Sequence, residues 1–268
     1  MSKTLDDINW LTRSENRVQV LDLLAEETYS RPDLLEAIDV SRVTINRMIK
    51  ALEERSWIEQ ASRDSEYRLT HAGRLVVEDL SRLLETTDTA ERLSDLEQYL
   101  PVEEFDFDLR RLGDAEITTP TRTNTVAPLK ESADIMCEAD RGRVVSNHWD
   151  IVHVQAAAAH LQQHPDSIEF QLIFLGDSPE VVAADPDLAA GFQDTYELSS
   201  SEYYRHPGEL LYSVSIYDQT VVLGLIDGSG FIPASFTSDD PEVLAWAEDT
   251  FERYKSEAQS IDADMFAS

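Results

Sequence analysis

The chain contains 268 residues, of which 53 are acidic and 22 are basic, and its formal net charge is −31. Hydrophobic residues make up 42% of the sequence, which is enough for packed cores and excludes a disordered acidic chain. At about 100–200 residues per domain, the length predicts two domains. A membrane-spanning helix needs about 18 consecutive apolar residues, and no apolar run in the sequence is that long. The single cysteine, Cys137, cannot close an intrachain disulfide. We therefore expect a cytoplasmic protein without a membrane partner.

The basic side chains comprise only 4 lysines beside 18 arginines. An excess of carboxylates with few lysines is expected of a protein that stays soluble in concentrated salt, because carboxylates hold hydrated cations. Repulsion between them is screened there, since the Debye length is about 3 Å at 1 M salt. We therefore predict adaptation to high salt. An ordinary acidic cytosolic protein is the alternative.

Charge is divided unequally along the chain. Residues 1–82 carry 12 basic and 16 acidic side chains, whereas residues 83–268 carry 10 basic and 37 acidic ones. A nearly neutral stretch inside a strongly acidic protein indicates a polyanionic partner such as nucleic acid. A neutral domain with well-paired charges would give the same numbers.

The first third of the sequence contains helical periodicity followed by two short alternating segments. The predicted helices lie at residues 13–27, 30–38, 41–55 and 70–84, and the predicted strands at residues 57–61 and 66–69. Ser14, Ser30 and Ser41 stand at N-cap positions of the first three helices. Three helices followed by a β-hairpin are typical of a winged helix-turn-helix domain, which we place at residues 1–85.

Two segments carry a family resemblance. VSRVTINRMIKALEERSWIE (residues 40–59) resembles the recognition-helix segment of archaeal and bacterial winged-helix regulators, and YRLTHAGRLV (residues 67–76) resembles their wing-to-helix junction. The resemblance covers residues 13–85. Many relatives have glycine at the position of Ser56, where a left-handed residue is wanted, so we expect modest backbone strain there.

The third predicted helix has one apolar face and one polar face. At 100° per residue, Ile45, Ile49 and Leu52 form a core stripe, and the other side holds basic and amide side chains. Arginine and lysine can donate to guanine, asparagine can pair with adenine, and a helix N-terminus suits a phosphate. We therefore predict that this face contacts double-stranded DNA; a solvated basic face is the alternative. The predicted DNA-binding residues are Ser41, Arg42, Val43, Thr44, Asn46, Arg47 and Lys50, with Arg63 and Arg68 on the hairpin.

Beyond this domain we expect a helical connector at residues 86–117, which could contribute a dimer contact, and an α/β domain at residues 118–268. Strand and helix patterns interleave there, which indicates a layered structure. The predicted strands are residues 144–145, 168–175, 209–217 and 220–226, and the predicted helices are residues 150–163, 179–190 and 240–255.

Residues 210–254 resemble the end of the effector domain in archaeal winged-helix regulators of the methanogenesis-regulatory type and, more loosely, of the TrmB-like sugar-responsive type. Those domains resemble half of a phospholipase D-like fold, whose motif is His-x-Lys-x4-Asp. With Asp218 as the last member, Leu211 and Ser213 stand at the histidine and lysine positions. The resemblance thus implies an α+β protein whose C-terminal α/β phospholipase D-like domain lacks the catalytic motif and serves sensing or oligomerisation.

Two further groups of residues are candidate binding sites. Four arginines retained in the acidic domain could bind an anionic metabolite, although local ion pairing is the commoner role; they are Arg122, Arg141, Arg143 and Arg205. His153, His160 and His164 share one side of a predicted helix, which could hold a metal. A solvated or pocket-lining face is favoured instead, because no cysteine or carboxylate cluster completes a ligand set.

These observations predict a homodimeric, sequence-specific DNA-binding transcriptional regulator. A small-molecule effector or the dimer geometry would tune its DNA affinity. We predict no catalytic activity, no cofactor and no metal. One alternative is a phosphoesterase-like enzyme, and another is a docking protein whose winged helix reads no DNA.

Overall fold

The computed structural model describes residues 3–61, 65–165 and 167–266. The chain divides into two compact units, residues 1–87 and residues 88–268. Each unit builds its own hydrophobic core.

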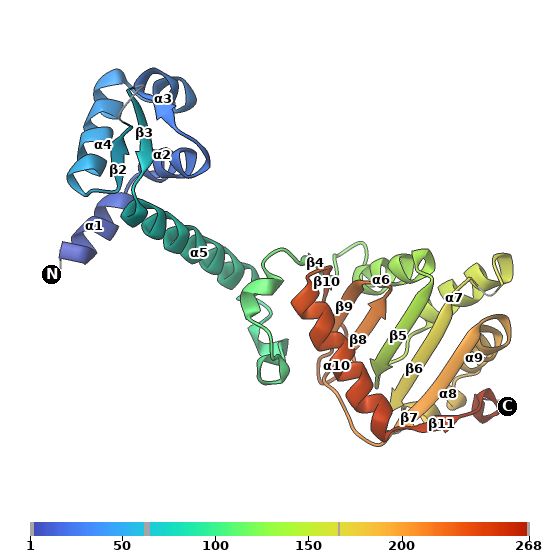
Figure 1. The fold of residues 1–268 in the computed structure, drawn as a ribbon. Coiled ribbons are helices and arrows are strands. Elements are labelled where there is room, and N and C mark those ends of the chain that lie inside the picture. Colours follow the sequence, from blue (N-terminus) through green and yellow to red (C-terminus); the bar gives the residue numbers. More distant parts are fainter. Residues whose placement is uncertain (1–2, 62–64, 166, 267–268) are drawn as a thin grey trace. The chain divides into compact units, whose positions relative to one another are not determined.

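The first unit confirms the predicted helices and hairpin (Figure 1). Its elements are α1 (Lys3–Thr12), α2 (Glu15–Glu26), β1 (Tyr29–Ser30), α3 (Arg31–Ala37), α4 (Arg42–Glu54), β2 (Ile58–Gln60), β3 (Glu66–Leu69) and α5 (His71–Leu93). α1 and β1 were not predicted. β1 pairs with β3 and turns the hairpin into a three-stranded sheet in the order β1-β3-β2.

Side-chain caps explain where the short helices begin. Ser30 and Asp33 form a capping box at the start of α3, because each side chain bonds the backbone N–H of the other. Ser41 accepts a hydrogen bond of 3.2 Å from the N–H of Thr44 and so caps α4. Ser14 occupies the N-cap of α2 but its side chain makes no capping bond.

α5 is longer than predicted, continuing past residue 84 to Leu93. Thr86 and Thr87 donate their side-chain hydroxyls to the carbonyls of Arg82 and Leu83, which satisfies these polar groups inside the helix. No glycine or proline interrupts this stretch, so the helical pattern runs on beyond the predicted domain end.

The apolar stripe of α4 packs into the core of the first unit as the helical wheel predicts. Ile45, Ile49 and Leu52 are completely buried, and Met48 is nearly so. Ser56 follows the helix with a φ of 57°, the left-handed conformation that we expected at this position.

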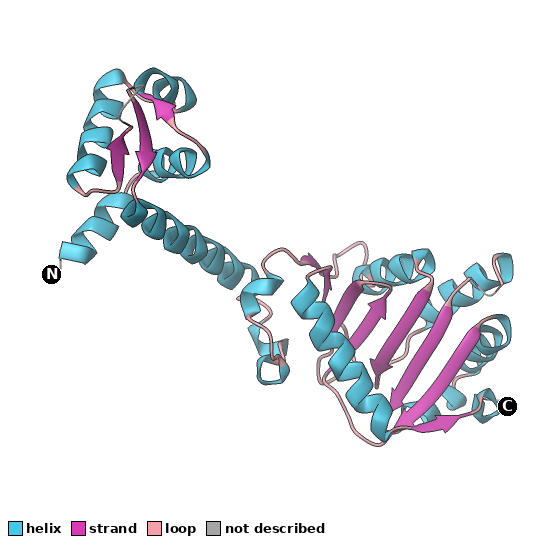
Figure 2. Ribbon diagram, viewed as in Figure 1, coloured by secondary structure: helices cyan, strands magenta, loops and turns pink. Residues whose placement is uncertain are grey.

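The second unit is a mixed eight-stranded sheet with helices on both faces (Figure 2). The elements are β4 (Glu116–Thr118), α6 (Ala127–Glu138), β5 (Arg141–Ser146), α7 (Ile151–Gln163), β6 (Glu169–Leu175), α8 (Ser178–Ala184), α9 (Pro186–Leu198), β7 (Ser200–His206), β8 (Tyr212–Tyr217), β9 (Thr220–Leu225), β10 (Ala234–Ser238), α10 (Pro241–Glu257) and β11 (Gln259–Ile261). The strand order is β11-β7-β6-β5-β8-β9-β10-β4, in which β5, β6 and β7 run parallel and the other pairs are antiparallel.

The two faces of this sheet have separate cores. α10, drawn in red in Figure 1, packs on one face, where Val214, Leu223 and Phe236 meet Trp246 and Phe251. The opposite face packs against α6, α7 and α9. Because side chains alternate along a strand, β8 and β9 supply residues to both cores.

Several elements of this unit differ from the sequence expectation. The predicted helix 179–190 is two helices, because Asp185 caps a new helix that begins at Pro186. α6, β4, β7, β10 and β11 were not predicted. β4 and β11 are edge strands of three residues each, too short to give a periodic signal.

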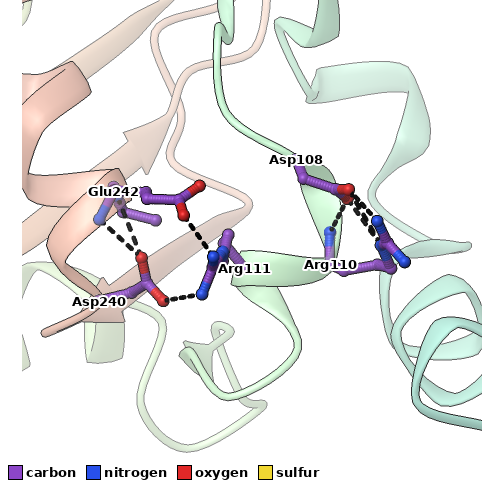
Figure 3. Close-up of polar contacts among 6 residues, drawn as sticks. Asp108, Arg110, Arg111, Asp240 and Glu242 are labelled. Carbon is purple, nitrogen blue, oxygen red and sulfur yellow. Dashed lines mark hydrogen bonds and ion pairs between the residues drawn. The ribbon is translucent and has the colours of Figure 1, made fainter. Parts of the chain in front are cut away.

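Residues 88–117 of the predicted connector belong to the second unit. Between the end of α5 and the start of β4 they form short 3-10 turns: Glu97–Tyr99, Val102–Glu104 and Leu109–Leu112. Leu96, Phe107 and Leu112 are buried in the core beneath α10. Figure 3 shows Arg111 bound to Asp240 and Glu242 at the N-terminus of α10, 3.5 Å from the Asp240 carboxylate. The segment is therefore anchored by packing and by ion pairs.

Candidate nucleic-acid interface

The polar face of α4 is open to solvent. Asn46, Arg47 and Lys50 are exposed, and Val43, near the start of the helix, is 78% exposed. Ser41 and Arg42 are also exposed, whereas Thr44 is half-buried and its hydroxyl lies 2.9 Å from that of Ser41. The structure therefore brings the seven predicted residues of this helix together on one accessible surface.

The cationic groups on this surface differ in how much of their charge is compensated. Within the described ranges, no carboxylate lies within 4.0 Å of Arg47. Lys50 lies 3.8 Å from Glu54, one helical turn further on. Both groups of that pair are exposed, so the pair holds the lysine only weakly. Among the described residues, Arg42 likewise has no carboxylate within 4.0 Å, so Arg42 and Arg47 are the uncompensated guanidinium groups of this face.

Of the two hairpin arginines predicted to contact DNA, the structure describes only Arg68. Arg68 on β3 is exposed, but its guanidinium binds Glu59 on β2 at 2.7 and 3.0 Å. Its charge is thus shared with a carboxylate that a phosphate would have to displace. Arg63 lies outside the described residues.

Sequence reasoning missed a cluster of side chains that joins α1 to the C-terminal end of α4. Arg55, at the end of α4, forms an ion pair of 2.8 Å with Asp7 of α1 and lies 3.9 Å from the ring centre of Trp10. The guanidinium of Arg17 also lies over the Trp10 ring, 4.4 Å from the ring centre. Burial, followed by the charges of Arg47 and Arg55, lowers the pKa of Arg17. Trp10 was the available signal, but it lies in a helix that the sequence did not predict.

The four arginines of the predicted anion site do not converge. Three of them are paired with separate carboxylates: Arg141 with Glu169 at 3.7 Å, Arg143 with Glu248 at 2.6 Å, and Arg205 with Glu180 at 2.6 Å. Arg122 is exposed in the loop that follows β4. Local ion pairing, the commoner role, therefore accounts for the three paired residues.

The three histidines of α7 and its C-terminus also act separately. His153 binds Asp150 through Nδ1 at 2.7 Å, whereas His160 meets the hydroxyl of Ser167 at 3.0 Å and stacks near His164. Among the described residues, no group of three histidine, cysteine or acidic side chains is placed to hold a metal. In the same part of the chain, no helix combines the length and the apolar character that crossing a bilayer requires.

Family models match both units. Residues 5–92 match the HVO_A0261 N-terminal domain. Residues 125–257 match the middle domain of methanogenesis regulatory protein FilR1. No curated protein matches the chain significantly.

The solved structures that resemble this chain share little sequence identity with it. TrmBL2, an archaeal chromatin protein, is 11% identical over 87% of this chain and 88% of its own, with a TM-score of 0.41. NucT from Helicobacter pylori is 14% identical over 55% of this chain and 99% of its own, with a TM-score of 0.41. ZitR from Lactococcus lactis is 21% identical over 34% of this chain and 65% of its own, with a TM-score of 0.27.

Proposed function

We propose that the chain is a sequence-specific, DNA-binding transcriptional regulator of the archaeal TrmB-like kind. The observation that carries the proposal is the exposed face of α4, the helix that directly precedes the β2-β3 hairpin. This face presents an amide, uncompensated guanidinium groups and an ammonium. The match of residues 125–257 to a protein named as a regulator supports it.

The chemistry of this face fits the major groove. Arg47 can donate two parallel hydrogen bonds to O6 and N7 of guanine, and Asn46 can pair with N6 and N7 of adenine. The Val43 methyl groups can contact a thymine methyl. Ser41 and the first turn of α4 can bind a phosphate and so fix the position of the helix on the duplex.

The regulator acts as a homodimer in this proposal, with two copies of α4 meeting successive major grooves about 10 bp apart. Exposed apolar side chains on α1 and α5 support the dimer, because a second copy of the chain could cover this apolar surface. These side chains are Leu5, Ile8, Leu75, Leu83 and Leu84.

The second unit has no catalytic role in this proposal. At the phospholipase D motif positions, Leu211 is 73% exposed on the surface and Ser213 replaces the lysine. The carboxylate of Asp218 accepts hydrogen bonds from the N–H groups of Asp140 and Arg141 at 3.2 and 3.0 Å. Its oxygens therefore support a turn. The phospholipase D-like origin of this unit remains part of the proposal, and a phosphodiesterase assay that finds turnover would contradict the non-catalytic role.

The acidic surface and the scarcity of lysine fit a cytoplasm of high salt concentration. Molar salt weakens phosphate contacts, because log K falls by about 0.9 per log unit of salt for each neutralised phosphate. Uptake of cations by carboxylates near the duplex would offset this loss. We therefore expect a salt slope for DNA binding that is flatter than the number of cationic contacts alone gives.

Selection of bound duplexes from a random pool, in concentrated KCl, tests the proposal. We expect one enriched, inverted-repeat sequence. The Arg47→Ala, Lys50→Ala double variant should lose the preference for it, because two cationic donors of the face are removed. Arg82→Ala, which removes an exposed arginine on α5, is the control and should retain the preference. Equal binding of all duplexes by the unaltered chain would refute the proposal and favour the docking protein.

A further inference from the structure

The second unit contains a cavity between its sheet and the helices α6, α7 and α9. It provides about 80 Å³ of space that water molecules can enter. Strands β5, β8, β9 and β10 supply its floor, and Trp149 and His153 form part of its wall. It lies on the face of the sheet opposite to α10.

The floor of the cavity is a row of very small side chains that crosses three neighbouring strands. Ser213 of β8 pairs with Gly224 of β9, and Gly224 pairs with Ser235 of β10. A Cβ atom at residue 224 would lie only 2.5 Å from the Ser213 hydroxyl. The Ser213 hydroxyl therefore lies over Gly224, and this part of the floor has no room for a larger side chain at residue 224. Neighbouring positions on the same face of the sheet, Val222 and Tyr217, are filled with large side chains.

One polar group in this floor has no partner of its own. Ser235 is 3% exposed, and its hydroxyl makes no hydrogen bond to any described residue. Burying a hydroxyl without a partner is costly, and such groups are rare in folded proteins. Because Ser235 lines the cavity, its hydroxyl is placed to bond a molecule inside it.

The wall of the cavity is aromatic and rigid. Trp149 stacks on Phe174 with ring centres 4.3 Å apart and meets the edge of Phe192 at 5.4 Å. Its indole N–H donates to the Ser178 hydroxyl at 3.3 Å. The ring is therefore held in place and offers a flat apolar surface.

The charges around the cavity select against ions. Among the described residues that line it, there is no lysine or arginine. The single carboxylate, Asp150, is occupied, because one oxygen accepts the N–H groups of Val152 and His153 and the other binds the His153 ring. Apart from His148 and His153, the described lining residues include no basic side chain, so an anionic ligand would find no permanent countercharge, and a cationic ligand would find no free carboxylate.

We propose that this cavity binds a small uncharged ring molecule that carries a hydrogen-bonding group on one edge. The ring lies against Trp149, and the polar edge meets the hydroxyls of Ser213 and Ser235. At about 10–15 Å³ of such space per water molecule, the cavity suits a ligand of roughly five to eight non-hydrogen atoms. The inference deepens the effector part of the proposed function and rests on it only for the consequence at DNA.

Calorimetric titration of the full chain with four ring compounds of seven to nine non-hydrogen atoms tests the ligand class. Phenol is the neutral ring with a hydroxyl, toluene lacks the polar group, benzoate is an anion and benzylamine is a cation. We expect phenol to bind about fivefold more tightly than toluene, which is the effect of one hydrogen bond. Benzoate and benzylamine should bind more weakly than phenol. Benzoate or benzylamine binding as tightly as phenol, or no binding of phenol, would overturn the inference.

A pair of serine variants on β10 assigns the site. Ser235→Ala should weaken phenol about fivefold and leave toluene unchanged, without loss of thermal stability, because the hydroxyl it removes has no partner. Ser238→Ala is the control: Ser238 is buried on the same strand, and its hydroxyl accepts a hydrogen bond from Asp240 N–H. This control should lower stability and leave phenol binding unchanged. Equal weakening of phenol by both variants would place the ligand elsewhere.

Ligand binding and DNA binding fail independently in these experiments. If phenol does not bind while the selected duplex does, the cavity inference is wrong and the regulator proposal stands. If phenol binds but no duplex is selected, the proposed function is wrong while the ligand site stands. A shift of duplex affinity by phenol would show that the two units are coupled.

Discussion

Removing the carboxylate that holds Arg68 should strengthen DNA binding if the hairpin reaches the duplex. The Glu59 carboxylate accepts hydrogen bonds from Nη2 and Nε of the Arg68 guanidinium, at 2.7 and 3.0 Å. The Arg68 side chain is 58% exposed and that of Glu59 is 50% exposed. Glu59→Gln leaves the arginine uncompensated. An exposed pair of this kind contributes only about 0–1 kcal/mol to folding, so the fold should survive the change.

The magnitude follows from counterion release. One additional phosphate contact steepens the slope of log K against log salt by about 0.9, so lowering the salt fourfold should favour Glu59→Gln over the unaltered chain by a further factor of about 3.5. Fluorescence anisotropy of a labelled duplex, measured across a salt series, gives this slope directly.

Two variants with the same change in charge complete the experiment. Glu54→Gln frees Lys50 on α4 and should steepen the slope in the same way. Asp79→Asn frees Arg82 on α5, which lies 3.4 Å away, and should leave the slope unchanged. Identical slopes for Glu59→Gln and the unaltered chain would refute the placement of the hairpin on DNA, and equal steepening by all three variants would reduce the effect to net charge.

Three further predictions concern stability. Ser30→Ala should lower the free energy of unfolding of the first unit by about 1 kcal/mol in a urea titration, because it breaks a capping box. Ser14→Ala, at a cap without a side-chain hydrogen bond, should lower it by less. Equal losses would contradict the assignment of the capping box at Ser30. Ser56→Gly should raise the free energy of unfolding by about 1 kcal/mol, since glycine adopts a φ of 57° without strain; a loss in the same titration would show that the serine side chain matters more than the backbone. Burial alone would raise the pKa of Asp150, but hydrogen bonds from the side chain and backbone of His153 hold that pKa below its usual value. The stabilisation by the charged form is therefore present above the ordinary aspartate pKa of about 4 and is lost as the pH falls further. Asp150→Asn, which keeps the cap, should be less stable than the unaltered chain near neutral pH, with a difference that shrinks in acid; a difference independent of pH would rule out the carboxylate charge as its source.

The candidate interface was largely predictable because its signals are local. The spacing of Ile45, Ile49 and Leu52 fixes which side of α4 is buried, and it therefore fixes that Asn46, Arg47 and Lys50 are exposed. The capping serines are likewise read from residues within one turn. Such features depend on the period of the helix and on neighbours three or four residues away.

Contacts between residues far apart in the chain were not predictable. The sequence shows Arg68 as a cation, but only the pairing of β2 with β3 brings Glu59 to it. Arg141, Arg143 and Arg205 of the second unit find separate carboxylates in the same way, which charge and composition alone did not show.

The sequence by itself determined the two-part organisation, the winged helix and the exposed face of its third helix, since all three follow from periodicity and composition. Only the tertiary structure decided the strand order of the second unit and the cavity on its sheet. Ser213, Gly224 and Ser235 look like ordinary small residues in separate strands, and they become one floor because the register aligns them. Register between strands is set by packing of whole faces and by turn geometry, and no local pattern in a single sequence records it.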